Sequence, residues 1–241
     1  MIKLFADGAD WDGILQAAAI PKIVGFTTNP TLMKQAGVTD YTAFSQKLIQ
    51  YLKDKRPDTC LSLEVFADDN KSMLKQARTI NSWANDYNVY IKIPITNTQG
   101  KSCVPVVKQL ASEGIKCNVT AVFTEDQVTE IVEEVDLSVP IIVSIFAGRI
   151  ADAGTDPVEI FNKVKEIHRQ HAKKNDELEF LWASSREAYN YVQARLCGCD
   201  IITMTMDLIK KMNNFGKDLN QFSLETVQMF YNDAVKSGFK I

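Results

Sequence analysis

Short apolar runs alternate with amphipathic patterns along nearly the whole chain. Eight runs have the length and the Val, Ile, Leu and Phe content of buried strands, at residues 2–6, 23–26, 61–66, 89–94, 116–120, 141–146, 179–184 and 201–204. Helical spacing fills most intervals, at residues 41–55, 71–86, 103–113, 125–134, 158–174 and 186–196. After the last strand we predict a short segment at 207–213 and a terminal helix at 224–236.

Strict alternation of strands and helices is typical of parallel strands joined by helical crossovers. Eight such units in 241 residues, 46% of them hydrophobic, predict an α/β fold, a (β/α)8 TIM barrel. The alternative, an open doubly wound sheet, favours a Gly-x-Gly-x-x-Gly loop after its first strand, but residues 7–10 read Asp-Gly-Ala-Asp. No linker divides the chain. We therefore expect one barrel domain over residues 1–241, with a C-terminal helix within 222–241 packing on the barrel or on a neighbouring subunit.

Charge and composition narrow the range of partners. The net charge is −3 with acids and bases interspersed, so we expect neither a nucleic-acid surface nor a membrane surface. No apolar run is long enough to cross a membrane. Five scattered cysteines, an odd number, favour reduced thiols and a cytoplasmic location. Neither Cys197 with Cys199 nor His168 with His171 forms part of a complete ligand set, so we predict no metal site.

Lys92 is a basic side chain inside an apolar strand, in the segment Val-Tyr-Ile-Lys-Ile-Pro. Burial disfavours the ammonium and lowers the pKa of a lysine, which makes a neutral amine available near pH 7. A neutral amine can attack a carbonyl to give a carbinolamine and then a Schiff base. The alternative is a structural lysine on an edge strand whose head reaches solvent.

Polar residues recur where the predicted strands end, and in a TIM barrel the chemistry lies at the carboxyl ends of the strands. These residues are Asp7, Thr27, Thr28, Asn29, Glu64, Lys92, Thr96, Asn118, Thr120, Ser144, Arg149, Ser184 and Arg186. Seven successive strands contribute, so we expect one shared rim.

Six motifs give the chain a resemblance to the transaldolase family, class I Schiff-base aldolases on a (β/α)8 barrel. They are Phe-Ala-Asp at 5–7, Gly-Phe-Thr-Thr-Asn-Pro-Thr-Leu at 25–32, Lys-Ile-Pro at 92–94, Asn-Val-Thr-Ala-Val-Phe at 118–123, Ser-Ile-Phe-Ala-Gly-Arg-Ile at 144–150 and Ala-Ser-Ser-Arg at 183–186. The resemblance covers nearly the full length.

The resemblance implies a role for each matching residue. Lys92 is similar to the Schiff-base lysine, and Asp7 to the acid/base that takes a proton from the C4 hydroxyl of the donor. Glu64 and Thr120 match the pair that holds the catalytic water. The groups expected around the three-carbon unit are Asn29, Asn118 and Ser144, with Phe146 as pocket wall. Those expected at the sugar phosphate are Arg149, Ser184 and Arg186.

Each role has a structural alternative. Asp7 could cap the helix that begins near Trp11, and Asn29 before a proline could be only a helix cap. Glu64 could be a buried ion-pair partner of an arginine or of Lys92. Arg186 could pair with a helix acid. At these positions the sequence alone leaves both interpretations open.

The leading hypothesis is a transaldolase that moves a dihydroxyacetone unit from fructose 6-phosphate or sedoheptulose 7-phosphate to an aldose phosphate. The first alternative is a fructose-6-phosphate aldolase, which releases free dihydroxyacetone; that branch of the family carries Tyr where this chain has Phe146, and Gln where it has Glu64. The second alternative is a sugar-phosphate-binding barrel without catalysis. The resemblance implies no cofactor and a homo-oligomer.

Four departures from the family pattern stand near the motifs. Ile145 replaces a usual proline, Gly8 a threonine or serine, and Ser185 a bulkier apolar residue, while Trp182 is larger than usual. We expect all four near the end of the pocket that receives the aldose. The identity of the acceptor, and with it the choice between central sugar metabolism and a specialised pathway, stays open.

Overall fold

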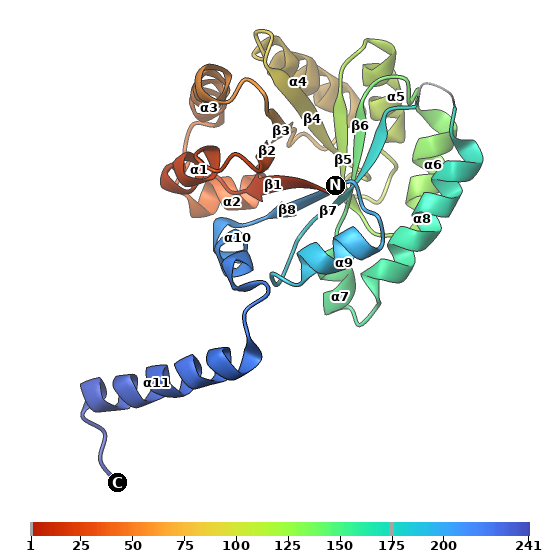
Figure 1. Ribbon diagram of the computed structural model, residues 1–241. Helices are drawn as coiled ribbons and strands as arrows, with labels where there is room; N and C mark the ends of the chain where they lie inside the picture. Colours follow the sequence, from red (N-terminus) through yellow and green to blue (C-terminus); the bar gives the residue numbers. More distant parts are fainter. Residues whose placement is uncertain (1, 174–175) are drawn as a thin grey trace.

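The computed structural model describes residues 2–173 and 176–241. Within these residues eight parallel strands close into a barrel in sequence order, with helices around the outside (Figure 1). The strands are β1 (Lys3–Asp7), β2 (Ile23–Thr27), β3 (Cys60–Glu64), β4 (Asn88–Pro94), β5 (Cys117–Val122), β6 (Ile141–Ile145), β7 (Leu178–Trp182) and β8 (Ile201–Met204). The predicted TIM barrel is confirmed.

Helices follow every strand. They are α1 (Trp11–Ala18), α2 (Pro30–Gln35), α3 (Tyr41–Lys55), α4 (Asn70–Ser82), α5 (Val104–Ser112), α6 (Glu125–Glu134), α7 (Ala147–Asp152), α8 (Pro157–His171), α9 (Asn190–Leu196), α10 (Met206–Lys211), a 3-10 turn η1 (Met212–Asn214) and α11 (Leu219–Ser237). The helix predicted at 71–86 ends before Asn85 and Asp86, whose positive φ angles of 45° and 69° are incompatible with a right-handed helix. For the helix predicted at 158–174, residue 174 lies outside the described residues.

Two boundary differences matter for the functional end of the barrel. The strand predicted at 179–184 ends at Trp182, and α9 begins only at Asn190. Ser184 and Arg186 therefore lie on the loop between β7 and α9, where functional residues of such barrels commonly stand.

Every second residue of each strand points into the barrel, so the inward side chains form layers. The layer nearer the amino ends of the strands, called the lower layer here, is apolar and buried, and includes Phe5, Cys60, Tyr90, Ile142, Leu181 and Ile201. Two residues further along a strand, the inward positions are polar, as at Asp7 after Phe5 and Lys92 after Tyr90. Gly25 lies beside Phe5, where a Cβ atom would come 2.5 Å from the ring. The sequence thus fills the lower barrel and leaves its upper end to polar groups.

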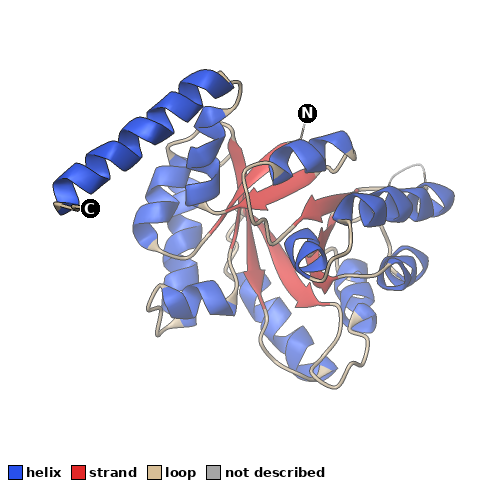
Figure 2. Ribbon diagram, turned by 90° about the horizontal axis from the view of Figure 1, so that it is seen from below, coloured by secondary structure: helices blue, strands red, loops and turns tan. Residues whose placement is uncertain are grey.

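The last helix stands apart from the rest. Figures 1 and 2 show α11 extending away from the barrel, and none of its residues is buried. It carries many exposed apolar side chains, among them Phe222, Leu224, Phe230 and Tyr231. Among the described residues, no helix is long and apolar enough to span a membrane.

Candidate active site

Lys92 lies in the upper layer of the barrel, on β4. Only 6% of the residue is exposed, and its Nζ lies 3.0 Å from Oε2 of Glu64. The two residues are register partners on the adjacent strands β3 and β4, which is why their side chains meet. Nζ also donates a hydrogen bond of 3.1 Å to the carbonyl oxygen of Thr28. The interpretation as a solvent-reaching lysine is wrong, and the ion pair with Glu64 is present.

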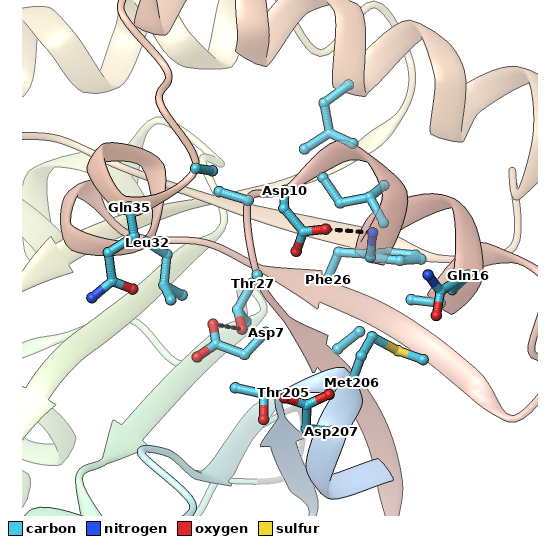
Figure 3. A pocket seen from close by; sticks show the side chains of 18 of the residues that line it. Asp7, Asp10, Gln16, Phe26, Thr27, Leu32, Gln35, Thr205, Met206 and Asp207 are labelled. Carbon is cyan, nitrogen blue, oxygen red and sulfur yellow. Dashed lines mark hydrogen bonds between the residues drawn. The ribbon is translucent and has the colours of Figure 1, made fainter. Parts of the chain in front are cut away.

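Asp7 ends β1 beside this pair. The hydroxyl of Thr27, its register partner on β2, donates to Oδ1 of Asp7 at 2.7 Å (Figure 3). A second hydroxyl, on Thr203, lies 2.6 Å from that of Thr27 and extends the chain of hydrogen bonds. Burial raises the pKa of Asp7 above its ordinary value, against the opposing effects of the Lys92 charge and the Thr27 hydrogen bond. A carboxyl group with a raised pKa is suited to accept and return a proton near neutral pH.

The alternative in which Asp7 caps a helix is wrong. Asp10 performs that function, because its Oδ1 accepts a hydrogen bond of 2.6 Å from the backbone N–H of Gly13 in α1 (Figure 3). For Asn29 the cap is confirmed: its Oδ1 accepts from the N–H of Leu32 at 3.0 Å. Asn29 also lines the cavity at the carboxyl ends of the strands, which is called the active cavity below.

A cavity of about 510 Å³ lies above the Lys92–Glu64 pair at the carboxyl ends of the strands. Every predicted site residue except Asn118 lines it: Asp7, Asn29, Glu64, Lys92, Thr120, Ser144, Phe146, Arg149, Ser184 and Arg186. The fold therefore brings together side chains from seven strand ends.

Asn118 lies beneath the cavity and is fully buried. Its Nδ2 donates to the hydroxyl of Ser62 at 3.0 Å, and its Oδ1 accepts from Ser144 at 2.7 Å. Asn118 therefore positions Ser144, which lines the cavity. Asn118 itself does not line the cavity.

Thr120 reaches the cavity through an irregularity in β5. The register with β6 shifts between Val119 and Val122, and Ala121 has a positive φ of 59°. A bulge of this kind re-aims neighbouring side chains. The buried Thr120 hydroxyl has no hydrogen-bond partner among the described residues. Such a group is costly unless it binds water or a ligand, and Thr120 lines the same cavity as Glu64, where either could bind.

Two arginines lie at the mouth of the cavity. Arg149 is on α7, and Arg186 follows β7; both are exposed. The loop at Ser184, whose φ is 62°, packs directly on α7, because a Cβ atom on Gly148 would lie 1.7 Å from the Ser184 carbonyl oxygen. Only glycine permits this approach. Arg186 pairs with Asp152, as the alternative interpretation allowed.

Some lining residues were missed by the sequence analysis. Thr203 and Thr205 line the cavity from β8 and the segment after it, so the rule about carboxyl strand ends could have found them. Gln35 reaches the cavity from α2, and no sequence signal marks it.

The four departures from the family pattern do not all lie where we expected. Ser185 lines the active cavity, and its hydroxyl donates to the Thr203 carbonyl oxygen at 2.9 Å. Ile145 and Trp182 are fully buried in the core between barrel and helices, where Trp182 stacks on Phe161. The expectation that they border the aldose is wrong, because they alternate with the inward residues of their strands.

Gly8 borders a second cavity, of about 400 Å³, between β1, α1, α2 and α10 (Figure 3). This cavity shares Asp7, Thr27, Gln35 and other residues with the active cavity. The space around Asp7 is therefore open on two sides.

The fold and the cavity define a TIM-barrel protein whose cavity at the carboxyl ends of the strands is lined by a buried lysine, two carboxyl groups and two arginines. A model of the Transaldolase/Fructose-6-phosphate aldolase family matches residues 4–241. A "Probable transaldolase" of Dehalococcoides mccartyi is 31% identical over 211 residues, 88% of this chain and 90% of the relative. Another of Thermoanaerobacter sp. is 30% identical over the full length of both chains. The chain belongs to the transaldolase/fructose-6-phosphate aldolase family.

Proposed function

We propose that this chain is a transaldolase that moves a dihydroxyacetone unit from a ketose phosphate, such as fructose 6-phosphate or sedoheptulose 7-phosphate, to an aldose phosphate. The observation that carries the proposal is the placement of Lys92, Glu64 and Asp7 around one cavity with two arginines at its mouth. The names of its relatives support the same activity.

Catalysis begins at Lys92. Its ammonium gives a proton to Glu64, and the free amine attacks C2 of the ketose to form a carbinolamine. Loss of water, with proton transfers through Glu64 and a water held by Thr120, leaves an iminium bond between Nζ and C2. The iminium then acts as an electron sink for the next step.

Asp7 starts the carbon–carbon cleavage. It takes the proton from the C4 hydroxyl, the C3–C4 bond breaks, and the bonding electrons move into the iminium to give an enamine. The first aldose leaves with its new carbonyl group. The enamine carbon attacks the aldehyde carbon of the acceptor, whose oxygen receives the proton back from Asp7. Water then hydrolyses the iminium and releases the product ketose and free Lys92.

The mouth residues bind the phosphate. Forked guanidinium donors suit a phosphate dianion, and Arg149, Arg186 and Ser184 line the cavity from two segments that pack together. Asn29 and Ser144 line the inner cavity, where hydroxyls of the three-carbon unit would lie.

An aldolase that releases free dihydroxyacetone is the second candidate. Water must protonate the enamine carbon for that release, and a phenol at position 146 would assist. Phe146 has no hydroxyl; it lines the cavity, and its ring centroid lies 5.8 Å from that of Phe123. The apolar ring of Phe146 would shield the imine from water. Glu64 likewise follows the transaldolase pattern. These two residues favour transfer over release.

The test compares turnover of fructose 6-phosphate with and without erythrose 4-phosphate. A transaldolase forms sedoheptulose 7-phosphate and depends on the acceptor, whereas rapid release of dihydroxyacetone without acceptor would support the aldolase. Binding of fructose 6-phosphate without either product would support the non-catalytic barrel. A panel of aldose phosphates then defines the acceptor and its pathway.

We also propose a homo-oligomer in the cytoplasm. The exposed apolar side chains of α11, including Leu224, Phe230 and Tyr231, would be covered by a second copy of the chain. Five free, buried cysteines fit a reducing compartment. Light scattering of the wild type against a Phe230→Asp variant tests the assembly; an unchanged mass would contradict it.

A further inference from the structure

We propose that Asp152 is a positioning residue that holds the Arg186 guanidinium ready for a phosphate at the cavity mouth. The inference rests on the proposed function, since it concerns the same phosphate site. Asp152 has no family role in the sequence analysis and does not line the cavity, whereas Arg186 does.

Asp152 and Arg186 form a bidentate ion pair, in which two nitrogens of the guanidinium donate to the carboxylate. Nε of Arg186 donates to Oδ1 and Oδ2 of Asp152 at 3.2 and 3.1 Å, and Nη2 donates to Oδ2 at 2.5 Å. A forked pair fixes the plane of the guanidinium as well as its position. Because Asp152 uses the Nε side, the end that carries Nη1 stays available to another anion.

The backbone of Arg186 is fixed as well. Its N–H donates to Oδ1 of Asn190 at 2.8 Å, and the N–H of Glu187 donates to the same oxygen at 3.1 Å. Asn190 is buried at the start of α9. Arg186 is therefore anchored at both ends of its side chain before any substrate arrives.

Arg149 lies at the same cavity mouth, but its side chain is not anchored as that of Arg186 is. Its side chain has no ion pair or hydrogen bond to any residue of 2–173 and 176–241. It lies one helical turn before Asp152 on α7, so the carboxylate faces both cations. A phosphate that binds must order Arg149, whereas Arg186 has already lost most of its rotamer freedom.

A positioned guanidinium should bind phosphate more tightly than a free one, despite the nearby negative charge. We expect Asp152→Ala to weaken binding about five- to tenfold, because the free Arg186 side chain must then be ordered by the ligand. Asp152→Asn keeps the shape and one acceptor oxygen, and should lie between the alanine variant and the wild type. If Asp152 instead competes with the phosphate for Arg186, both variants bind phosphate more tightly, and the proposal is overturned.

The experiment is a calorimetric titration of the full chain with inorganic phosphate and with glycerol 3-phosphate. The double variant Asp152→Ala with Arg186→Ala separates positioning from other effects: it should bind no more weakly than Arg186→Ala alone. Additive losses would show that Asp152 acts on something other than Arg186, and would contradict the inference.

Glu113→Ala is the matched control. Glu113 accepts the same kind of fork from Nε and Nη2 of Arg78, at 2.9 and 2.6 Å, on the outer helices away from the cavity. Loss of this pair should leave phosphate affinity unchanged. A weakening equal to that of Asp152→Ala would mean that the effect is a general loss of stability.

Steady-state kinetics supply a second readout. Asp152→Ala should raise KM for fructose 6-phosphate about five- to tenfold with little change in kcat, and leave turnover of unphosphorylated fructose unaltered. If the wild type fails to turn over sugars, the titration still decides the role of Asp152. If the wild type turns over sugars but does not bind either phosphate probe, the role of Asp152 is contradicted and the proposed function stands.

Discussion

Two cation–carboxylate pairs stand at opposite ends of the same cavity. At its floor, Lys92 and Glu64 have side chains only 7% and 17% exposed; at its mouth, Arg186 and Asp152 have side chains 47% and 55% exposed. A pair in the interior controls where a proton resides, because a lone charge there is strongly destabilised. A pair in solvent contributes little to stability, so its value lies in orientation. Under the proposed function, proton transfer therefore belongs to the pair at the floor and phosphate recognition to the pair at the mouth.

The largest effect is expected at the floor. Lys92→Ala should reduce turnover by at least about 10⁴-fold, since the covalent step loses its nucleophile. The barrel should still fold, although Glu64 loses its partner. Fixed-time product assays measure the turnover, and circular dichroism measures the folding. Lys116→Ala removes a lysine at the other end of the strands and should retain activity; wild-type rates in the Lys92 variant would exclude the mechanism.

Asp7→Asn should lower kcat about 10²–10⁴-fold, as expected for the loss of an acid/base group. The same change should raise Tm at neutral pH. The folded protein holds the Asp7 proton more tightly than the unfolded chain, because burial raises the pKa; ionisation of this group therefore opposes folding. The difference in Tm between variant and wild type should shrink as the pH falls through the folded pKa. A variant that melts below the wild type at every pH would contradict this reading.

Asp10→Ala is the control for Asp7. It removes the side-chain cap of α1, so it should lower the stability by about 0.5–2 kcal/mol and keep the activity. Changes in stability of opposite sign for the variants at Asp7 and Asp10 would show that the effect at Asp7 comes from its buried charge.

At the mouth the effects should fall on KM. Arg186→Ala should raise KM for fructose 6-phosphate about 10- to 100-fold, because a charge-assisted fork to phosphate is lost. The value of kcat should change little, since the floor is untouched. A large loss of kcat with unchanged KM would mean that Arg186 takes part in the chemistry and that the division between floor and mouth is wrong.

Arg149→Ala should give the smallest change, about three- to fivefold in KM. This arginine must lose rotamer freedom on binding, which offsets part of its contact energy. The ratio of the two KM effects measures how much preorganisation contributes. Equal effects for Arg149 and Arg186 would remove the argument for anchoring by Asp152.

Much of the site could be predicted because it follows the strands. Asp7 and Lys92 share an inward direction with the apolar residues two positions before them, Phe5 and Tyr90, and Glu64 shares it with Cys60 four positions earlier. The carboxyl ends of parallel strands meet on one rim. The same period would have placed Ile145 and Trp182 outside the barrel, since they alternate with Ser144 and Leu181.

What the sequence could not predict depends on contacts between distant segments. The pair of Asp152 and Arg186 joins a helix to a loop after the next strand, and neither residue carries a local signal for the other. The bulge at Ala121 has a φ that only the folded sheet enforces. The two hydrogen bonds that commit Asn118 to Ser62 and Ser144 likewise appear only when three strands meet.

The most direct measurement of the central claim is borohydride trapping with fructose 6-phosphate, followed by mass analysis of the peptides. The account predicts a single reduced dihydroxyacetone adduct on Lys92, absent from Lys92→Ala and from samples without sugar. Trapping on another lysine, or no covalent adduct in a protein that turns over the sugar, would contradict it.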